Sequence, residues 1–187
     1  MKTGTKAFFD MFAGGSRSGV MWEGYVYLRW IGRCLYHLRK STGGPAVRPR
    51  DDGGEPIDEL IQDAVARLLP ELTSRETSPY HGKMLTLADA KKLVSIDREI
   101  SFAPLPESVI PYAKARDLIL KNPDHIAVID CPCRTSREGH CEPVDVCMLV
   151  GEPFAGFVLE HGVANARAID RDEALAILQK TDELGWT

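Results

Sequence analysis

Four of the five cysteines in this chain lie in one short stretch of the sequence. They follow the spacing C-x-C-x7-C-x5-C, and they are Cys131, Cys133, Cys141 and Cys147. A thiolate is a strong ligand for soft metal ions, and disulfides are rare in the reducing cytoplasm, where this chain is expected to reside. Thiols gathered this densely therefore predict a metal ion or an iron–sulfur cluster rather than a pair of disulfides.

The spacing of the four thiols indicates which centre they hold. Structural zinc sites usually pair cysteines as C-x2–4-C, so that each pair grips the ion from one turn, and neither end of this run matches that pattern. An iron–sulfur cubane tolerates uneven spacing because each thiolate binds its own iron, although the run also differs from the bacterial ferredoxin pattern C-x2-C-x2-C-x3-C-P. The spacing favours a [4Fe–4S] cluster and leaves zinc as the alternative.

Three polar residues close to the cysteines are candidate neighbours of the centre. Arg134 and Arg137 follow Cys133 and would offset the negative charge of a thiolate-bound cluster, or serve as solvated loop residues. His140 precedes Cys141 and would replace a cysteine in a Cys3His zinc site, or lie outside the ligand set. We expect all three beside the centre and the four cysteines as its ligands.

The segment from Val109 to Thr187 resembles a recurring, ferredoxin-associated segment of uncharacterised microbial iron–sulfur proteins. The resemblance rests on four stretches: Val109-Ile-Pro-Tyr112, Ala127 to Arg134 with its C-P-C-R, Cys141 through Pro143 and Asp145 to Cys147, and Ile169 to Leu178. It implies a [4Fe–4S] cluster on Cys131, Cys133, Cys141 and Cys147 and a role in electron transfer. The implied partner is a redox protein or a larger oxidoreductase complex.

The elements that must position the cysteines are read from hydrophobic periodicity and breaker residues. His125–Asp130 is rich in β-branched residues and predicts a strand that ends at the first cysteine pair. Short helices are predicted at about 144–150, where Cys147 lies, and at 153–161. A last helix begins at Asp170, whose spacing to Glu173 is that of a capping box. The predicted fold is a helix-rich α/β fold with a small sheet, several short helices and a loop-bound cluster.

Three more helices are predicted upstream of the strand. The first runs from Pro56 to Leu69 and is stopped by Pro70, the second runs from Thr86 to Val94 with Thr86 as its cap, and the third runs from Pro111 to Lys121. The stretches 41–56 and 71–84 are predicted as a linker and a loop.

The net charge of −4 is unevenly distributed along the chain. Residues 1–50 contain nine Lys and Arg against two Asp and Glu, a net charge of +7, whereas residues 51–187 carry −11. The split predicts a basic, aromatic, amphipathic helical arm over 1–50 and an acidic iron–sulfur domain over 51–187. The arm would meet a partner protein or the membrane surface, or would fold against its own acidic body.

One amphipathic helix is predicted for the arm, from Val20 to Lys40. Arg29, Arg33 and His37 recur every four residues and line one face, while apolar and aromatic residues cover the rest. The mixture of aromatic and basic side chains suits a peripheral membrane contact through residues 20–40, and it matches no known nucleic-acid module, so nucleic acid is not the expected partner. Cys34 lies on this helix and is expected to be buried.

A chain of 187 residues allows one ordinary domain, and its composition is close to the globular average. It contains no apolar run of about 18 residues, no secretory leader and no phosphate-binding loop, and no catalytic residues are identified. We therefore expect an electron-transfer subunit rather than a complete enzyme. The alternatives are a zinc-stabilised module whose basic arm contacts a protein or RNA, and a metal-dependent enzyme with an open cluster iron.

Overall fold

The computed structural model describes residues 1–13, 18–49, 55–73, 86–101 and 119–185. The elements in this part of the chain occur in the order α1 (Thr3–Ala13), α2 (Ser18–Arg29), α3 (Ile31–Ser41), α4 (Glu55–Thr73), α5 (Leu87–Val94), β1 (Ile100–Ser101), β2 (Ile119–Asp130), α6 (Pro132–Thr135), β3 (Asp145–Glu152), α7 (Phe154–His161), the 3₁₀ turn η2 (Val163–Asn165), β4 (Arg167–Ile169) and α8 (Arg171–Glu183). The fold is the predicted helix-rich α/β fold with a small sheet, and the sheet is antiparallel.

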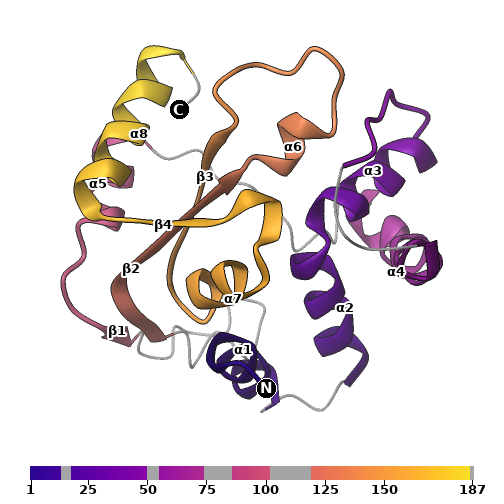
Figure 1. The fold of residues 1–187 in the computed structure, drawn as a ribbon, viewed down its shortest axis with the longest axis horizontal. Coiled ribbons are helices and arrows are strands. Elements are labelled where there is room, and N and C mark those ends of the chain that lie inside the picture. Colours follow the sequence, from indigo (N-terminus) through magenta and orange to yellow (C-terminus); the bar gives the residue numbers. More distant parts are fainter. Residues whose placement is uncertain (14–17, 50–54, 74–85, 102–118, 186–187) are drawn as a thin grey trace.

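Strand β2 is the centre of the sheet. It pairs with β3 along one edge and with β4 along the other, and the short strand β1 pairs with its beginning. The residues Ile126–Val128 are hydrogen-bonded on both sides, opposite Val150–Met148 of β3 and Ile169–Arg167 of β4. Beyond Val128, β2 pairs with β3 alone, as far as Asp130, where the cysteine segment begins (Figure 1).

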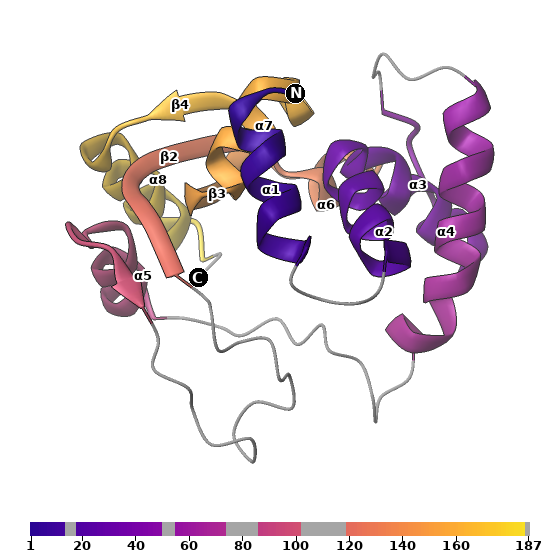
Figure 2. The same cartoon turned by 90° about the horizontal axis from the view of Figure 1, so that it is seen from below.

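Side chains of β2 alternate between two hydrophobic cores, as a strand with both faces buried requires. Ala127 and Ile129 belong to a core that also contains Phe8 of α1 and Phe157 of α7. Ile126 and Val128 face the opposite way, into a core formed with α5 and α8. Figures 1 and 2 show α5 and α8 together on the side of the sheet away from α2, α3 and α4.

The predicted helix over residues 20–40 is two helices, with a break at Trp30. Trp30 has φ −127° and ψ 42°, outside the helical region, between α2 and α3. The break has a packing reason: α2 lies against α1, α4 and α7, whereas α3 lies against α4 and α6, and one straight helix would not reach all of these surfaces. Cys34 is buried as predicted, in a third core with Val26, Ile61 and Val65.

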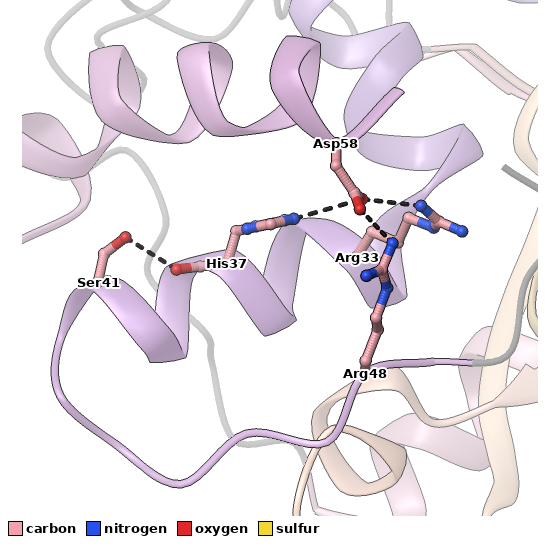
Figure 3. Close-up of polar contacts among 5 residues, drawn as sticks. All are labelled: Arg33, His37, Ser41, Arg48 and Asp58. Atoms are coloured by element: carbon pink, nitrogen blue, oxygen red, sulfur yellow. Dashed lines mark hydrogen bonds and ion pairs between the residues drawn. The ribbon is translucent and has the colours of Figure 1, made fainter. Parts of the chain in front are cut away.

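Basic residues of the predicted arm form ion pairs and hydrogen bonds within the protein. Arg33 Nη1 donates a hydrogen bond to Asp58 Oδ1 on α4 at 2.8 Å, and His37 Nε2 lies 3.4 Å from the same oxygen. Arg48, in the segment between α3 and α4, pairs with Asp58 Oδ2 (Figure 3). Of the two expectations for the arm, these contacts match the one in which it folds against its own acidic body. Partner or membrane contact through residues 20–40 stays a prediction, as does the domain boundary near residue 50.

Both helix starts that were predicted from capping residues are confirmed. Thr86 caps α5 by accepting a hydrogen bond from the N–H of Asp89, and Asp170 caps α8 by accepting one from the N–H of Glu173. The predicted helix over 153–161 is also present, as α7. Capping depends on residues three apart, so the local sequence suffices to predict it.

Three predicted elements differ from the structure. Helix α4 continues past Pro70 to Thr73, although a proline at this place removes a backbone donor and crowds the carbonyl group four residues earlier. Ile119–Lys121, predicted as the end of a helix, begin β2 because they pair with β1 and β3; residues 102–118, which include the rest of that helix, lie outside the described part. The helix predicted at 144–150 is strand β3, discussed below. The loop predicted at 71–84 falls mostly outside the described residues.

Among the described residues, none of the helices combines the length and the apolar character that crossing a bilayer requires.

Candidate metal centre

The cysteine segment begins where the central strand ends. Cys131 directly follows β2, and its N–H donates to the carbonyl oxygen of Val144 at 2.7 Å, which continues the pairing with the chain that leads into β3. The same residue is the N-cap of the short helix α6, with Pro132 at its first position. Cys131 is thus fixed from both sides, by the sheet before it and by the helix after it.

Cys147 lies on strand β3 and not on the predicted helix. It faces Ile129 directly in the antiparallel register. The stretch after Asp145 is aliphatic and β-branched, and its pairing with β2 outweighs the helical spacing that suggested a helix. The register shifts after Ile129, since Asp130 pairs with Asp145, and beyond this irregularity the thiols of Cys131 and Cys147 interact.

Three of the four thiols interact with one another. Hydrogen bonds from the thiols of Cys133 and Cys147 hold the pKa of Cys131 well below its ordinary value, while burial acts in the opposite direction. The same contacts raise the pKa of Cys133 and of Cys147, because each keeps its proton while it donates to Cys131. The structure therefore brings Cys131, Cys133 and Cys147 together around a sulfur that ionises readily, and a thiolate is the form that binds metal.

The backbone of α6 also favours the thiolate form of Cys131, although the Cys131 side chain accepts no capping hydrogen bond from this helix. The N–H groups of Arg134 and Cys133 also lower the pKa of Cys131, after the two thiol contacts. Backbone N–H groups directed at cysteine sulfur are the usual means by which a protein stabilises the charge of a thiolate-bound centre. Cys131 itself is 9% exposed, and its burial acts against the thiolate form.

Cys141 stands in a different position from the other three. It is exposed, in the irregular segment that connects α6 to β3. Across the described ranges, no three His, Cys, Asp or Glu side chains are already arranged around a common ion position. This finding includes Cys131, Cys133 and Cys147, so binding of one centre by the four cysteines stays a prediction and requires their side chains to come closer together.

The three predicted polar neighbours occupy distinct places. Arg134 donates from Nη1 to the carbonyl oxygen of Pro143 at 2.8 Å and so ties α6 to the end of the cysteine segment; its charge also acts on Cys147. Arg137 is exposed, and its charge acts on Cys133. His140 is exposed and lies 3.2 Å from Glu142 through Nε2, a contact at the surface of the segment.

Two residues that hold the cysteine segment in place were not among the predicted site residues. Arg39, on α3, donates from Nε to Ser136 Oγ at 3.0 Å and from Nη2 to the carbonyl oxygen of Cys133 at 3.4 Å. Ser136 is only 2% exposed, and its carbonyl oxygen accepts from the N–H of Val47 at 3.0 Å. Hydrogen bonds from Arg39 and Val47 therefore hold the turn after Cys133 in place. The sequence contains no signal for this contact, because the partners are far apart along the chain.

No protein-family model, no curated protein and no solved structure matches this chain. The candidate centre is therefore assessed from its sequence and geometry.

Proposed function

We propose that this chain is an iron–sulfur electron-transfer protein, or the small subunit of an oxidoreductase complex, with one [4Fe–4S] cluster on Cys131, Cys133, Cys141 and Cys147. The observation that carries the proposal is the meeting of the Cys131, Cys133 and Cys147 thiols, which come from the end of β2, from α6 and from β3. Cys131 and Cys133 lie at the end of β2 and the start of α6, and Cys147 lies on the neighbouring strand β3, so the proposal places the centre at this end of the sheet.

The residues around the thiols suit this centre in both ligand type and charge. Thiolates are the usual ligands of iron–sulfur clusters, and a four-thiolate cubane carries a net charge of about −2 that rises to about −3 on reduction. The positive charges of Arg39 and Arg137 act on Cys133, and that of Arg134 acts on Cys147. When bound, the cluster would supply one-electron chemistry at a potential that these charges and the N–H groups of α6 raise.

The exposure of two of the cysteines supports exchange of electrons with another protein. Cys133 and Cys141 are exposed, whereas Cys131 is buried and Cys147 half-buried. A centre with this asymmetry would lie close to the surface on one side and against the sheet on the other. The partner oxidoreductase would then approach over the segment between α6 and β3.

The proposal is tested by metal analysis of the full chain purified without oxygen. We expect about four iron atoms per chain and a broad absorbance at about 400 nm that bleaches on reduction. The reduced cluster should also give an electron paramagnetic resonance signal. Stoichiometric zinc without visible absorbance would overturn the proposal and favour the zinc-stabilised binding module instead.

A further inference from the structure

The thiols of Cys131, Cys133 and Cys147 form a chain of contacts with Cys131 in the middle. The Cys131 sulfur interacts through hydrogen bonds with the thiol of Cys133 and with the thiol of Cys147. Cysteines whose sulfurs already touch can form a disulfide with little movement, whereas cysteines held far apart cannot. The same three side chains that are candidate ligands are therefore also candidates for reaction with one another.

The three thiols differ in how easily solvent reaches them. Cys133 is exposed, Cys147 is half-buried and Cys131 is 9% exposed. A small reagent from solution therefore meets Cys133 first. Because the Cys133 thiol contacts the Cys131 sulfur, a reaction that begins at the surface can be passed inward to Cys131 and from there to Cys147.

A lasting disulfide between Cys131 and Cys133 is disfavoured by the backbone. Pro132 alone separates the two cysteines, and it begins α6, of which Cys131 is the N-cap. The disulfide would close a small ring, and the proline fixes one backbone angle within that ring. A strained disulfide is exchanged more readily than an unstrained one, so this bond is suited to be an intermediate.

A disulfide between Cys131 and Cys147 would instead join two neighbouring strands. Cys147 lies on β3 opposite Ile129, and Cys131 directly follows β2 and donates its N–H to the carbonyl oxygen of Val144. The register of the pairing shifts between Ile129 and Asp130. Such an irregularity disrupts the ladder locally, so any adjustment that the bond needs falls where the pairing is already uneven.

A bond between Cys131 and Cys147 would act on the whole set of candidate ligands. The loop that it closes also contains Cys133 and Cys141. The bond consumes two of the four thiols, and a sulfur in a disulfide is no longer the thiolate that binds metal. Where disulfides form in a reducing compartment, they are usually transient and catalytic or redox-sensing. The position of this pair therefore fits a reversible switch better than a structural staple.

We propose that Cys131 and Cys147 form a reversible disulfide when their metal centre is absent, with Cys133 as the thiol through which the oxidant enters. The oxidant is a small-molecule disulfide, such as oxidised glutathione. Formation of the bond does not depend on which centre the cysteines hold. Its consequence rests on the proposed function: the oxidised chain cannot take up the [4Fe–4S] cluster until the bond is reduced.

The reaction consists of three successive thiol–disulfide exchanges. Cys133 attacks one sulfur of the oxidant RS–SR, so that a Cys133–SR bond forms, the RS–SR bond breaks and one RSH leaves with the proton of Cys133. Cys131 attacks the Cys133 sulfur and releases the second RSH, which carries the proton of Cys131. Cys147 then attacks the Cys131 sulfur, and the electron pair of the broken bond returns to Cys133 together with the proton of Cys147. In sum, two protein thiols are oxidised and one RS–SR is reduced to two RSH.

The test treats the full chain with oxidised glutathione after the chain has been reduced and freed of metal by a chelator without oxygen. A thiol titration of the denatured product should show a loss of two thiols, from five to three. Mass spectrometry of unreduced peptides should show a link between Cys131 and Cys147 and no retained glutathione. Dithiothreitol should restore all five thiols.

Serine substitutions separate the entry thiol from the final pair. Cys133→Ser should slow formation of the bond about tenfold or more without changing which pair is linked, because the oxidant must then reach a less exposed sulfur. The matched control is Cys141→Ser, which removes the other exposed cysteine and should change the rate less than about twofold. Cys147→Ser should stop the reaction at retained glutathione or at a Cys131–Cys133 bond. Circular dichroism verifies that each variant is folded.

Any of four outcomes overturns the inference: no loss of thiols, a final disulfide that includes Cys141, equal rates for the wild type and Cys133→Ser, or assembly of a cluster on the oxidised chain before reduction. Iron analysis of the chain before metal removal reports separately on the proposed function. A chain that never holds iron but forms the Cys131–Cys147 bond would contradict the proposed function and support this inference. A chain that holds a cluster but forms no such bond after metal removal would do the opposite.

Discussion

Cys147 lies opposite Ile129 in the antiparallel pairing of β2 with β3, and this register places its thiol against that of Cys131. Cys131 in turn continues the ladder through its hydrogen bond to Val144. The end of the β2–β3 pairing, where the register shifts after Ile129, thus brings these two thiols together. Cys133 joins them from the first turn of α6. Of the four cysteines, Cys141 alone lies in the segment between α6 and β3.

The first prediction concerns the ligand set. Alanine substitution of Cys131, Cys133, Cys141 or Cys147 should each abolish the visible absorbance and reduce the iron content well below about four per chain, since each thiolate binds its own iron. Cys34→Ala is the control, because Cys34 is buried in the separate core between α3 and α4. If Cys141→Ala alone keeps its cluster, the centre is held by three cysteines and has an open iron.

The second prediction concerns Arg39, which contacts both Ser136 Oγ and the carbonyl oxygen of Cys133. Arg39→Gln should lower the reduction potential of the cluster, because removing a nearby positive charge disfavours the more negative reduced form. Arg39→Lys keeps the charge and should recover most of the potential. A potential that is the same in all three proteins, measured by redox titration, would show that Arg39 acts only through the structure of the turn.

The third prediction concerns the carboxylate that joins α3 to α4. Asp58→Asn removes the negative charge that Arg33 Nη1 contacts at 2.8 Å, while the Arg33 side chain stays only 4% exposed. The free energy of unfolding should fall by about 3 kcal/mol. Asp63→Asn is the control on the exposed face of the same helix and should change stability by less than about 0.5 kcal/mol. Urea denaturation measures both, and similar losses in the two variants would contradict a special role for Asp58.

The fourth prediction is the pH dependence of that same contribution. Burial raises the pKa of Asp58, but the hydrogen bonds from Arg33 and His37 and the charge of Arg48 outweigh it, so the pKa lies below the ordinary value of 3.8. A carboxylate with a depressed pKa stabilises the fold fully above its ordinary pKa and loses that contribution as the pH falls through the folded value. The stability difference between wild type and Asp58→Asn should therefore be constant near neutral pH and shrink below about pH 4. A difference that grows as the pH falls would contradict this assignment.

The fifth prediction compares two helical glycines. A Cβ on Gly4 of α1 would lie 2.7 Å from the backbone carbon of Gly156 on α7, so Gly4→Ala must push the two helices apart. We expect a loss of about 1–3 kcal/mol. A Cβ on Gly24 of α2 would meet Phe8 at 3.8 Å, an ordinary contact, so Gly24→Ala should be neutral or stabilise by up to about 1 kcal/mol. Thermal unfolding of both variants checks the opposite signs.

Local sequence signals were reliable where the physical cause is itself local. Thr86 and Asp170 cap helices as predicted because the accepted N–H groups belong to residues only three positions away. The strand over His125–Asp130 was predicted from its β-branched composition and forms the second half of β2. The burial of Cys34 was predicted because free cysteine is commonly a small, buried apolar residue.

Local signals failed where distant parts of the chain compete for a segment. The sequence around Cys147 has helical spacing, yet pairing with β2 makes it a strand. The segment 20–40 reads as one helix, yet contacts with α1 and α7 on one side and with α6 on the other break it at Trp30. In both cases burial against a remote surface outweighs a modest local preference.

By itself the sequence determined the kind of chemistry available to this protein: four thiols, their spacing, the cations near them and the opposite charges of its two parts. Only the tertiary structure decided where these groups act. It joined three of the thiols across the sheet, engaged Arg33 and His37 with Asp58, and brought Arg39 to the cysteine segment. The reason is physical: residue types carry ligand preference and charge, whereas the partner of each group is chosen by contacts between residues far apart in the chain.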